Sequence, residues 1–129
     1  MIEVELKDST SLFIMLAKDG TVNRKGDLKT KDNNFFMGIS NNGLLENFTK
    51  TITNDISDYL NRVHVLADTA KNVNKIKVGF SGPNGDTGFE YYTNEAVENL
   101  PKPILNLITN AIQVTDPWFR VQQAMLKPN

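Results

Sequence analysis

The fold is decided by two similar stretches, NGLLENFTKTI at residues 42–52 and NEAVENLPKPI at residues 94–104. Asparagine, glutamate, lysine and isoleucine recur at matching places, and the apolar residues Phe48 and Leu100 also match. Each stretch follows a strand–turn–strand pattern, so the sequence predicts two ββα units in succession. The alternative is chance similarity, because asparagine is common here and helix starts resemble one another for capping reasons.

Alternation of apolar and polar residues predicts the strands. It is clearest in IEVELK at residues 2–7 and in KIKVGF at residues 75–80. Residues 12–16 (LFIML) are apolar throughout, which indicates a central strand covered on both faces. Asp19-Gly20 predicts a tight turn after it, because glycine accepts positive φ and aspartate tolerates it. Return strands are expected at residues 21–25, 35–40 and 89–92.

Apolar residues at helical spacing predict two main helices. The first begins after Asn42 and carries Leu44, Leu45, Phe48, Ile52, Ile56, Tyr59, Leu60 and Val63. Its end is left open, because residues 63–66 could equally be a short extended piece. The second begins near Pro101 and Pro103, which suit the first turn of a helix. Asp116-Pro117 then predicts a stop followed by a short closing helix at residues 116–127.

These elements predict an α+β fold, a two-layer sandwich. Its antiparallel sheet would have about five or six strands, with the two main helices on one face and a short C-terminal helix. We expect one domain over residues 1–129, with internal halves at 1–70 and 73–115.

Composition narrows the class of protein. Lys and Arg number 14 against 15 Asp and Glu, a net charge of −1, which argues against a dedicated nucleic-acid binder. There is no cysteine, no signal-peptide pattern at the start and no apolar run of the ~20 residues that cross a bilayer. We therefore expect a soluble, cytoplasmic protein without membrane contact.

Catalytic signatures are sparse. His64 is the one histidine and lies among apolar neighbours, where a packed residue is the usual role. The absence of cysteine excludes Cys–His catalysis and cysteine-rich zinc sites, and no cofactor or metal is predicted. A small cofactor-independent enzyme would have to use Asp, Glu, Lys or the pair Tyr91 and Tyr92. We favour a non-enzymatic protein.

One hairpin concentrates basic residues. The predicted binding residues there are Lys18, Asp19, Asn23, Arg24 and Lys25, with Lys29 and Lys31 in the following loop. Such a cluster can attract an anion or a nucleic acid. The alternative is a solvated loop whose charges keep a sheet edge from pairing with other chains.

A second set of residues suggests an interface. If both main helices cover one face, something else must cover either Phe13 and Met15 or Leu12, Ile14 and Leu16, and the candidates are a partner subunit and the C-terminal helix with Trp118. Trp118, Phe119 and Arg120 are of the types that most often anchor interfaces, although Trp118 could instead close the end of the core. The sequence therefore predicts a non-catalytic binding or assembly module whose partner is another protein or a second copy, as in a homodimer.

Overall fold

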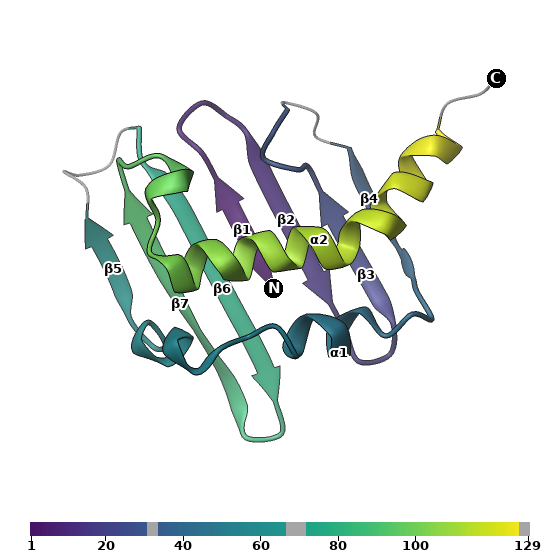
Figure 1. Cartoon of the computed structure of the whole chain (residues 1–129), viewed down its shortest axis with the longest axis horizontal. Helices are drawn as coiled ribbons and strands as arrows, with labels where there is room; N and C mark the ends of the chain where they lie inside the picture. The colour runs from purple at the N-terminus through teal and green to yellow at the C-terminus, as the bar shows by residue number, and fades with distance from the viewer. Residues whose placement is uncertain (31–33, 67–71, 127–129) are drawn as a thin grey trace.

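The computed structural model describes residues 1–30, 34–66 and 72–126. In this part of the chain seven strands form one sheet in the order β4-β3-β2-β1-β6-β7-β5 (Figure 1). All neighbours are antiparallel except β5 and β7, which are parallel. The strands are β1 (Ile2–Glu5), β2 (Ser11–Leu16), β3 (Thr21–Lys25), β4 (Phe35–Ile39), β5 (Val63–Leu66), β6 (Asn74–Gly82) and β7 (Gly85–Thr93).

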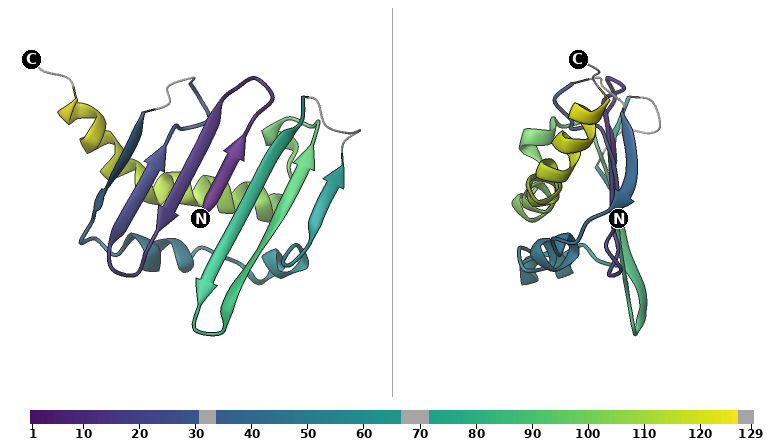
Figure 2. Two further views of the ribbon diagram at one scale, coloured as in Figure 1. Left: turned by 180° about the vertical axis from the view of Figure 1, so that it is seen from behind. Right: turned by 90° about the vertical axis from the view of Figure 1, so that its right-hand side faces the viewer.

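The helical elements all lie on one side of the sheet, as the edge-on view in Figure 2 shows. The long helix α2 (Lys102–Met125) crosses the sheet, and the short helix α1 (Leu44–Thr49) lies beside it. Two 3-10 helices, η1 (Asn54–Asp58) and η2 (Val97–Asn99), complete this layer. The other face of the sheet carries no covering element among the described residues.

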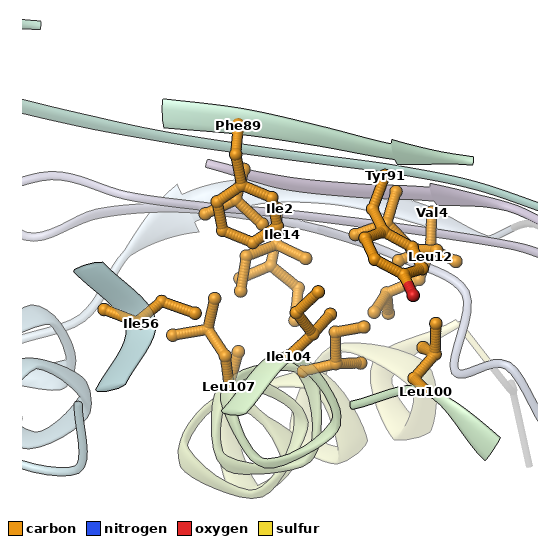
Figure 3. Close-up of a cluster of buried hydrophobic side chains, with 14 of the residues drawn as sticks. Ile2, Val4, Leu12, Ile14, Ile56, Phe89, Tyr91, Leu100, Ile104 and Leu107 are labelled. Atoms are coloured by element: carbon orange, nitrogen blue, oxygen red, sulfur yellow. The ribbon is translucent and has the colours of Figure 1, made fainter. Parts of the chain in front are cut away.

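The core lies between the sheet and α2 (Figure 3). The buried residues of α2 recur every three or four positions, so one stripe of the helix faces the sheet. They are Ile104, Leu107, Ile108, Ala111, Thr115 and Phe119. Alternate residues of the central strands point at this stripe, for example Val4, Leu12 and Ile76, which are almost fully buried.

The sheet differs from the predicted one. An antiparallel sheet of five or six strands is wrong, because residues 63–66 form a seventh strand that pairs in parallel with β7. The six strands predicted from alternation, apolar runs and turn residues are present. Strand β2 is covered on one face only: Leu12 and Ile14 are buried, whereas Phe13 and Met15 are partly exposed on the other face.

The prediction of two main helices is also wrong. α1 ends after six residues, at Thr49, and the residues beyond it form η1 and β5. The hydroxyls of Thr49 and Thr51 donate to the carbonyls of Leu45 and Phe48, an interaction that competes with helix continuation. The apolar residues beyond Thr49 keep helical spacing, but the low helix propensity of the β-branched residues there opposes a longer helix.

A separate closing helix is not observed. α2 runs through Pro117 without a break, although proline removes one intrahelical hydrogen bond. Arg24 of β3 contacts the helical turn that precedes Pro117. Its Nη1 donates to Thr115 Oγ1 at 2.9 Å and to Asp116 Oδ1 at 2.8 Å. The two similar stretches also diverge, since the first forms α1 and the second forms η2 before α2 begins. The chain is therefore not a pair of ββα units.

Candidate interaction surface

Strand β4 forms one edge of the sheet and exposes three large apolar side chains. Phe35, Met37 and Ile39 are 47%, 71% and 71% exposed. They alternate with Phe36 and Gly38, so all three lie on the face of the sheet that no helix covers. A contiguous apolar stripe therefore runs along an edge of the sheet that pairs with no further strand among the described residues.

The backbone N–H and C=O groups of β4 alternate in direction along the strand, as the side chains do. Ser40 N donates to Gly20 O at 2.9 Å and Gly26 N donates to Asn34 O at 3.3 Å, so even-numbered residues of this segment bond to β3. In an antiparallel ladder the intervening residues direct both polar groups to the other side. The N–H and C=O groups of Phe35, Met37 and Ile39 therefore point out of the free edge.

Two further apolar side chains, Phe13 and Met15 of β2, lie on the same face beyond the polar β3 residues Asn23 and Lys25. The rings of Phe13 and Phe35 stack with centroids 6.2 Å apart, although β3 separates their strands. Met15 is the next residue of β2 on this face. It lies opposite Asn23 of β3, which in turn lies opposite Met37 of β4. We call this set, Phe13, Met15, Phe35, Met37 and Ile39 with the outward backbone groups of β4, the β4 surface.

The centre of the same face is charged instead of apolar. Glu3 lies opposite Lys77, Glu5 lies opposite Lys75, and Lys77 lies opposite Glu90. The Lys77 Nζ and Glu90 Oε1 atoms are 3.6 Å apart, and both side chains are more than a third exposed. Such a ladder is well hydrated, so this part of the face is stable in water without a cover.

Helix α2 supports β4 from the opposite side. The Trp118 ring lies against Gly38, with Cζ2 2.9 Å from the position that a Cβ on Gly38 would take. Phe119 is buried and meets Phe36 edge-on at 5.6 Å. The helix then extends past the edge strand (Figures 1 and 2), and Val121, Met125 and Leu126 on this end are exposed.

The structure places Arg24, a predicted anion-binding residue, in the interior. Its side chain is 0% exposed and its Cζ lies 4.2 Å from the centre of the Phe119 ring. Nε donates to Gly26 O at 2.9 Å, and Nη1 donates to Asp116 Oδ1. Burial lowers the pKa of Arg24, although Asp116 opposes this effect. Arg24 thus links β3 to α2.

The other predicted binding residues are spread over different surfaces. Lys18 and Asp19 lie in the turn after β2, where Asp19 Oδ1 accepts a hydrogen bond from Thr21 N at 3.0 Å that lowers the pKa of Asp19. Asn23 and Lys25 lie on the uncovered face, between β2 and β4. Lys31 lies outside the described residues. The hairpin therefore does not gather its cations at one point.

The predicted interface residues fall on both faces. Phe13 and Met15 belong to the β4 surface, whereas Trp118 and Phe119 lie beneath β4 and Arg120 is exposed on α2. Sequence reasoning missed Phe35, Met37 and Ile39. The signal was present as FFMGI, an uncharged strand without apolar–polar alternation, but its edge position depends on pairing that no local pattern reveals.

A separate cleft opens on the helix side of the sheet. It has a volume of about 790 Å³ and lies between α1, the ends of β1 and β2, and the β6–β7 hairpin. Its walls are mainly apolar, and Lys18, Thr49 and Asp86 are among the polar residues that also line it. The apolar wall residues include Ile14, Leu16, Leu45, Phe48, Ile52 and Phe80.

His64 lies away from both places. Its Nε2 is 3.2 Å from Tyr59 O, and its ring packs near Tyr59 and Tyr91.

Burial raises the pKa of Tyr91, and the hydrogen bond to Glu90 raises that of Tyr92. Among the described residues, no three His, Asp or Glu side chains are grouped to hold a metal ion.

Within residues 1–30, 34–66 and 72–126, no helix has the length and apolar character needed to span a membrane. Comparison with protein-family models, with curated proteins and with solved structures finds no match to this chain.

Proposed function

We propose that this chain is a non-catalytic assembly module that binds another polypeptide through the β4 surface. The observation that carries the proposal is the coincidence of two features on one strand. The outward backbone groups of β4 and its exposed side chains Phe35, Met37 and Ile39 come from the same three residues.

Both features favour strand addition. An edge strand with unpaired N–H and C=O groups is a template for another strand, and native proteins usually block it with charge, proline or a bulge. The FFMGI sequence of β4 contains no charge and no proline. A strand added there would gain main-chain hydrogen bonds and cover the apolar stripe at the same time.

The opposite edge, β5, provides a comparison. Val63, Val65 and Leu66 are also exposed, at 59%, 60% and 62%. Val63 and Val65 lie opposite Glu90 and Tyr92 on the uncovered face, whereas Leu66 lies opposite the buried Thr93 on the helix side. The strand next to each edge is polar on this face, but the strand after it differs: Phe13 and Met15 lie beyond β3, whereas Lys75 and Lys77 lie beyond β7.

A charge on β4 tests the proposal. In extracts of cells that produce the tagged chain, we expect the wild type to elute in gel filtration above the size of a 14.5 kDa monomer. Met37→Lys should shift it to the monomer position, because it places a charge in the apolar stripe. Val65→Lys, at a similarly exposed position on β5, should leave the size unchanged. Equal elution of all three proteins would contradict assembly through β4.

The cleft supports a second candidate function, the binding of a small, mainly apolar molecule. Its volume of about 790 Å³ falls in the range of small-molecule sites, ~300–1,000 Å³, and its walls are apolar with a few polar groups. The fluorescent probe N-phenyl-1-naphthylamine should brighten on binding there. Thr49→Trp, at a lining position on α1, should reduce the brightening, and Lys50→Trp, at the next residue, should not. An equal response of the two variants would remove this candidate.

A further inference from the structure

We infer that the partner of the β4 surface is a second copy of this chain, with β4 of one protomer antiparallel to β4 of the other. The two copies would be related by a two-fold axis normal to the sheet. This inference rests on the proposed function, because it names the partner of the same surface. The result would be one continuous sheet with the helices of both protomers on the same side.

Strand β4 is complementary to itself. Its outward groups belong to residues 35, 37 and 39, which are two positions apart. When two such strands meet antiparallel, outward residues face outward residues and exchange about two hydrogen bonds per facing pair. Each facing pair of outward residues therefore supplies both the donors and the acceptors that it needs. The side chains of those residues all lie on the uncovered face, so the two apolar stripes join into one.

Charge favours this arrangement over the stacking of two uncovered faces. β4 itself carries no charge, so pairing it with a copy brings no like charges together. Stacking would instead bury the ladder formed by Glu5, Lys75, Lys77 and Glu90. Burial of ion pairs carries a desolvation cost that often exceeds their attraction. Edge pairing leaves this ladder in water.

The course of α2 restricts the register. Arg120 reaches toward Asp27, with Nη2 and Oδ2 3.7 Å apart, and Asp27 precedes β4. The end of α2 therefore leaves the sheet toward the Phe35 end of β4, as Figure 1 shows. Beyond Trp118, which lies against Gly38 on the helix side, the helix thus runs away from the Ile39 end of the edge. A two-fold axis at Gly38 places Met37 of each protomer opposite Ile39 of the other, with the two α2 ends on opposite sides of the axis.

The formation of a closed oligomer also favours pairing of β4 with β4 over pairing of β4 with β5. Identical edges related by a two-fold axis satisfy each other and stop at a dimer. Pairing β4 of one copy with β5 of the next would leave a free edge at each end, and the contact would repeat into an open chain. β5 is one residue shorter than β4, and two strands inward from it the uncovered face carries Lys75 and Lys77 instead of Phe13 and Met15.

Sedimentation of the purified chain at micromolar concentration tests the partner. We expect twice the 14.5 kDa mass for the wild type and for Val65→Lys, and a monomer for Met37→Lys. Met37 is 71% exposed, so the Met37→Lys monomer should retain its circular dichroism spectrum and urea midpoint. A purified wild-type monomer beside a larger complex in extracts would overturn the inference and leave the proposed function standing. Monomers under both conditions would overturn both.

Cysteine pairs test the register, since the natural chain has no cysteine. A hydrogen-bonded antiparallel pair has Cα atoms ~5.5 Å apart, within the range a disulfide requires. We expect mixed Met37→Cys and Ile39→Cys proteins to form a covalent dimer on mild oxidation. Met37→Cys mixed with Val65→Cys should form none. Cross-linking of the second mixture, or a wild-type dimer without cross-linking of the first, would overturn the inferred arrangement.

Discussion

Arg24 and Asp116, 92 residues apart in sequence, form an ion pair whose two members have very different access to water. The Arg24 side chain is fully buried, whereas that of Asp116 is 35% exposed, and Nη1 and Oδ1 are 2.8 Å apart. Arg24 Nη1 also bonds Thr115 Oγ1, and Nε bonds Gly26 O. The pair therefore links α2 to β3, the strand next to the edge strand β4.

This asymmetry predicts unequal costs for removing either partner. We expect Asp116→Asn to lower the free energy of unfolding by about 3 kcal/mol, because it leaves a buried cation without its counter-charge. Arg24→Met should cost less, about 2 kcal/mol, since the remaining Asp116 carboxylate can be hydrated. Urea denaturation measures both. The double variant should resemble Arg24→Met alone, and additive costs would contradict this account.

Gly38 is the position where β4 and α2 approach most closely. A Cβ there would lie 2.9 Å from Trp118 Cζ2, so Gly38→Ala must displace the Trp118 ring. We expect the free energy of unfolding to fall by about 1–3 kcal/mol, as for other overpacked sites. Trp118 is the only tryptophan, so its fluorescence should report the displacement directly.

Gly82→Ala is the matched control, because a Cβ at Gly82 meets no atom within 4 Å. That substitution should change stability by less than about 0.5 kcal/mol and leave the Trp118 emission unaltered. Similar effects of both substitutions would indicate a general cost of replacing strand glycines, and not the specific contact with Trp118.

Asp27 should make stability depend on pH. Burial alone would raise the pKa of Asp27, but hydrogen bonds from Lys29 N and Thr30 N, with Arg120 nearby, leave the pKa below its ordinary value. A carboxylate of this kind stabilises the fold above its unfolded pKa of about 3.9. The contribution is lost as pH falls through the folded pKa.

Replacing Asp27 isolates this effect. We expect Asp27→Asn to lower the free energy of unfolding by about 1 kcal/mol at pH 7, because it removes a charged acceptor, and by much less at pH 3. Urea denaturation at both pH values measures the difference. Asp19→Asn provides the comparison: Asp19 accepts a similar bond from Thr21 N but is fully exposed, so its effect should be smaller. A deficit for Asp27→Asn that is as large at pH 3 as at pH 7 would exclude the carboxylate as its origin.

The expected and observed structures agree where a feature depends on neighbouring residues, and they differ where it depends on residues far apart in the sequence. Alternation, short apolar runs and turn residues are local signals, and they located six strands and the turn at Gly20, which has a φ of 97°. The order of strands is not local, so nothing in FFMGI identified β4 as an edge. Arg24 was read as a surface cation because its partner Asp116 lies far along the chain. Residues 44–63 kept helical spacing, but the threonines near Thr49 ended α1.

Two glycines that face each other across β6 and β7 should respond very differently to substitution. Gly79 and Gly88 are paired in register. A Cβ on Gly88 would lie 2.2 Å from Val78 O, a backbone atom that cannot move without separating the strands. A Cβ on Gly79 would meet only the end of the Met1 side chain at 3.7 Å, an ordinary contact.

We therefore expect Gly88→Ala to lower the free energy of unfolding by about 3 kcal/mol or more, and Gly79→Ala by about 1 kcal/mol or less. Gly88 O also accepts a hydrogen bond from Asn61 N at 2.6 Å, so the distortion should reach the start of β5. Amide exchange at residues 61–66 would then accelerate in Gly88→Ala and not in Gly79→Ala. Equal stability of the two variants would show that the strands can separate locally, which would contradict the close backbone approach at this pair.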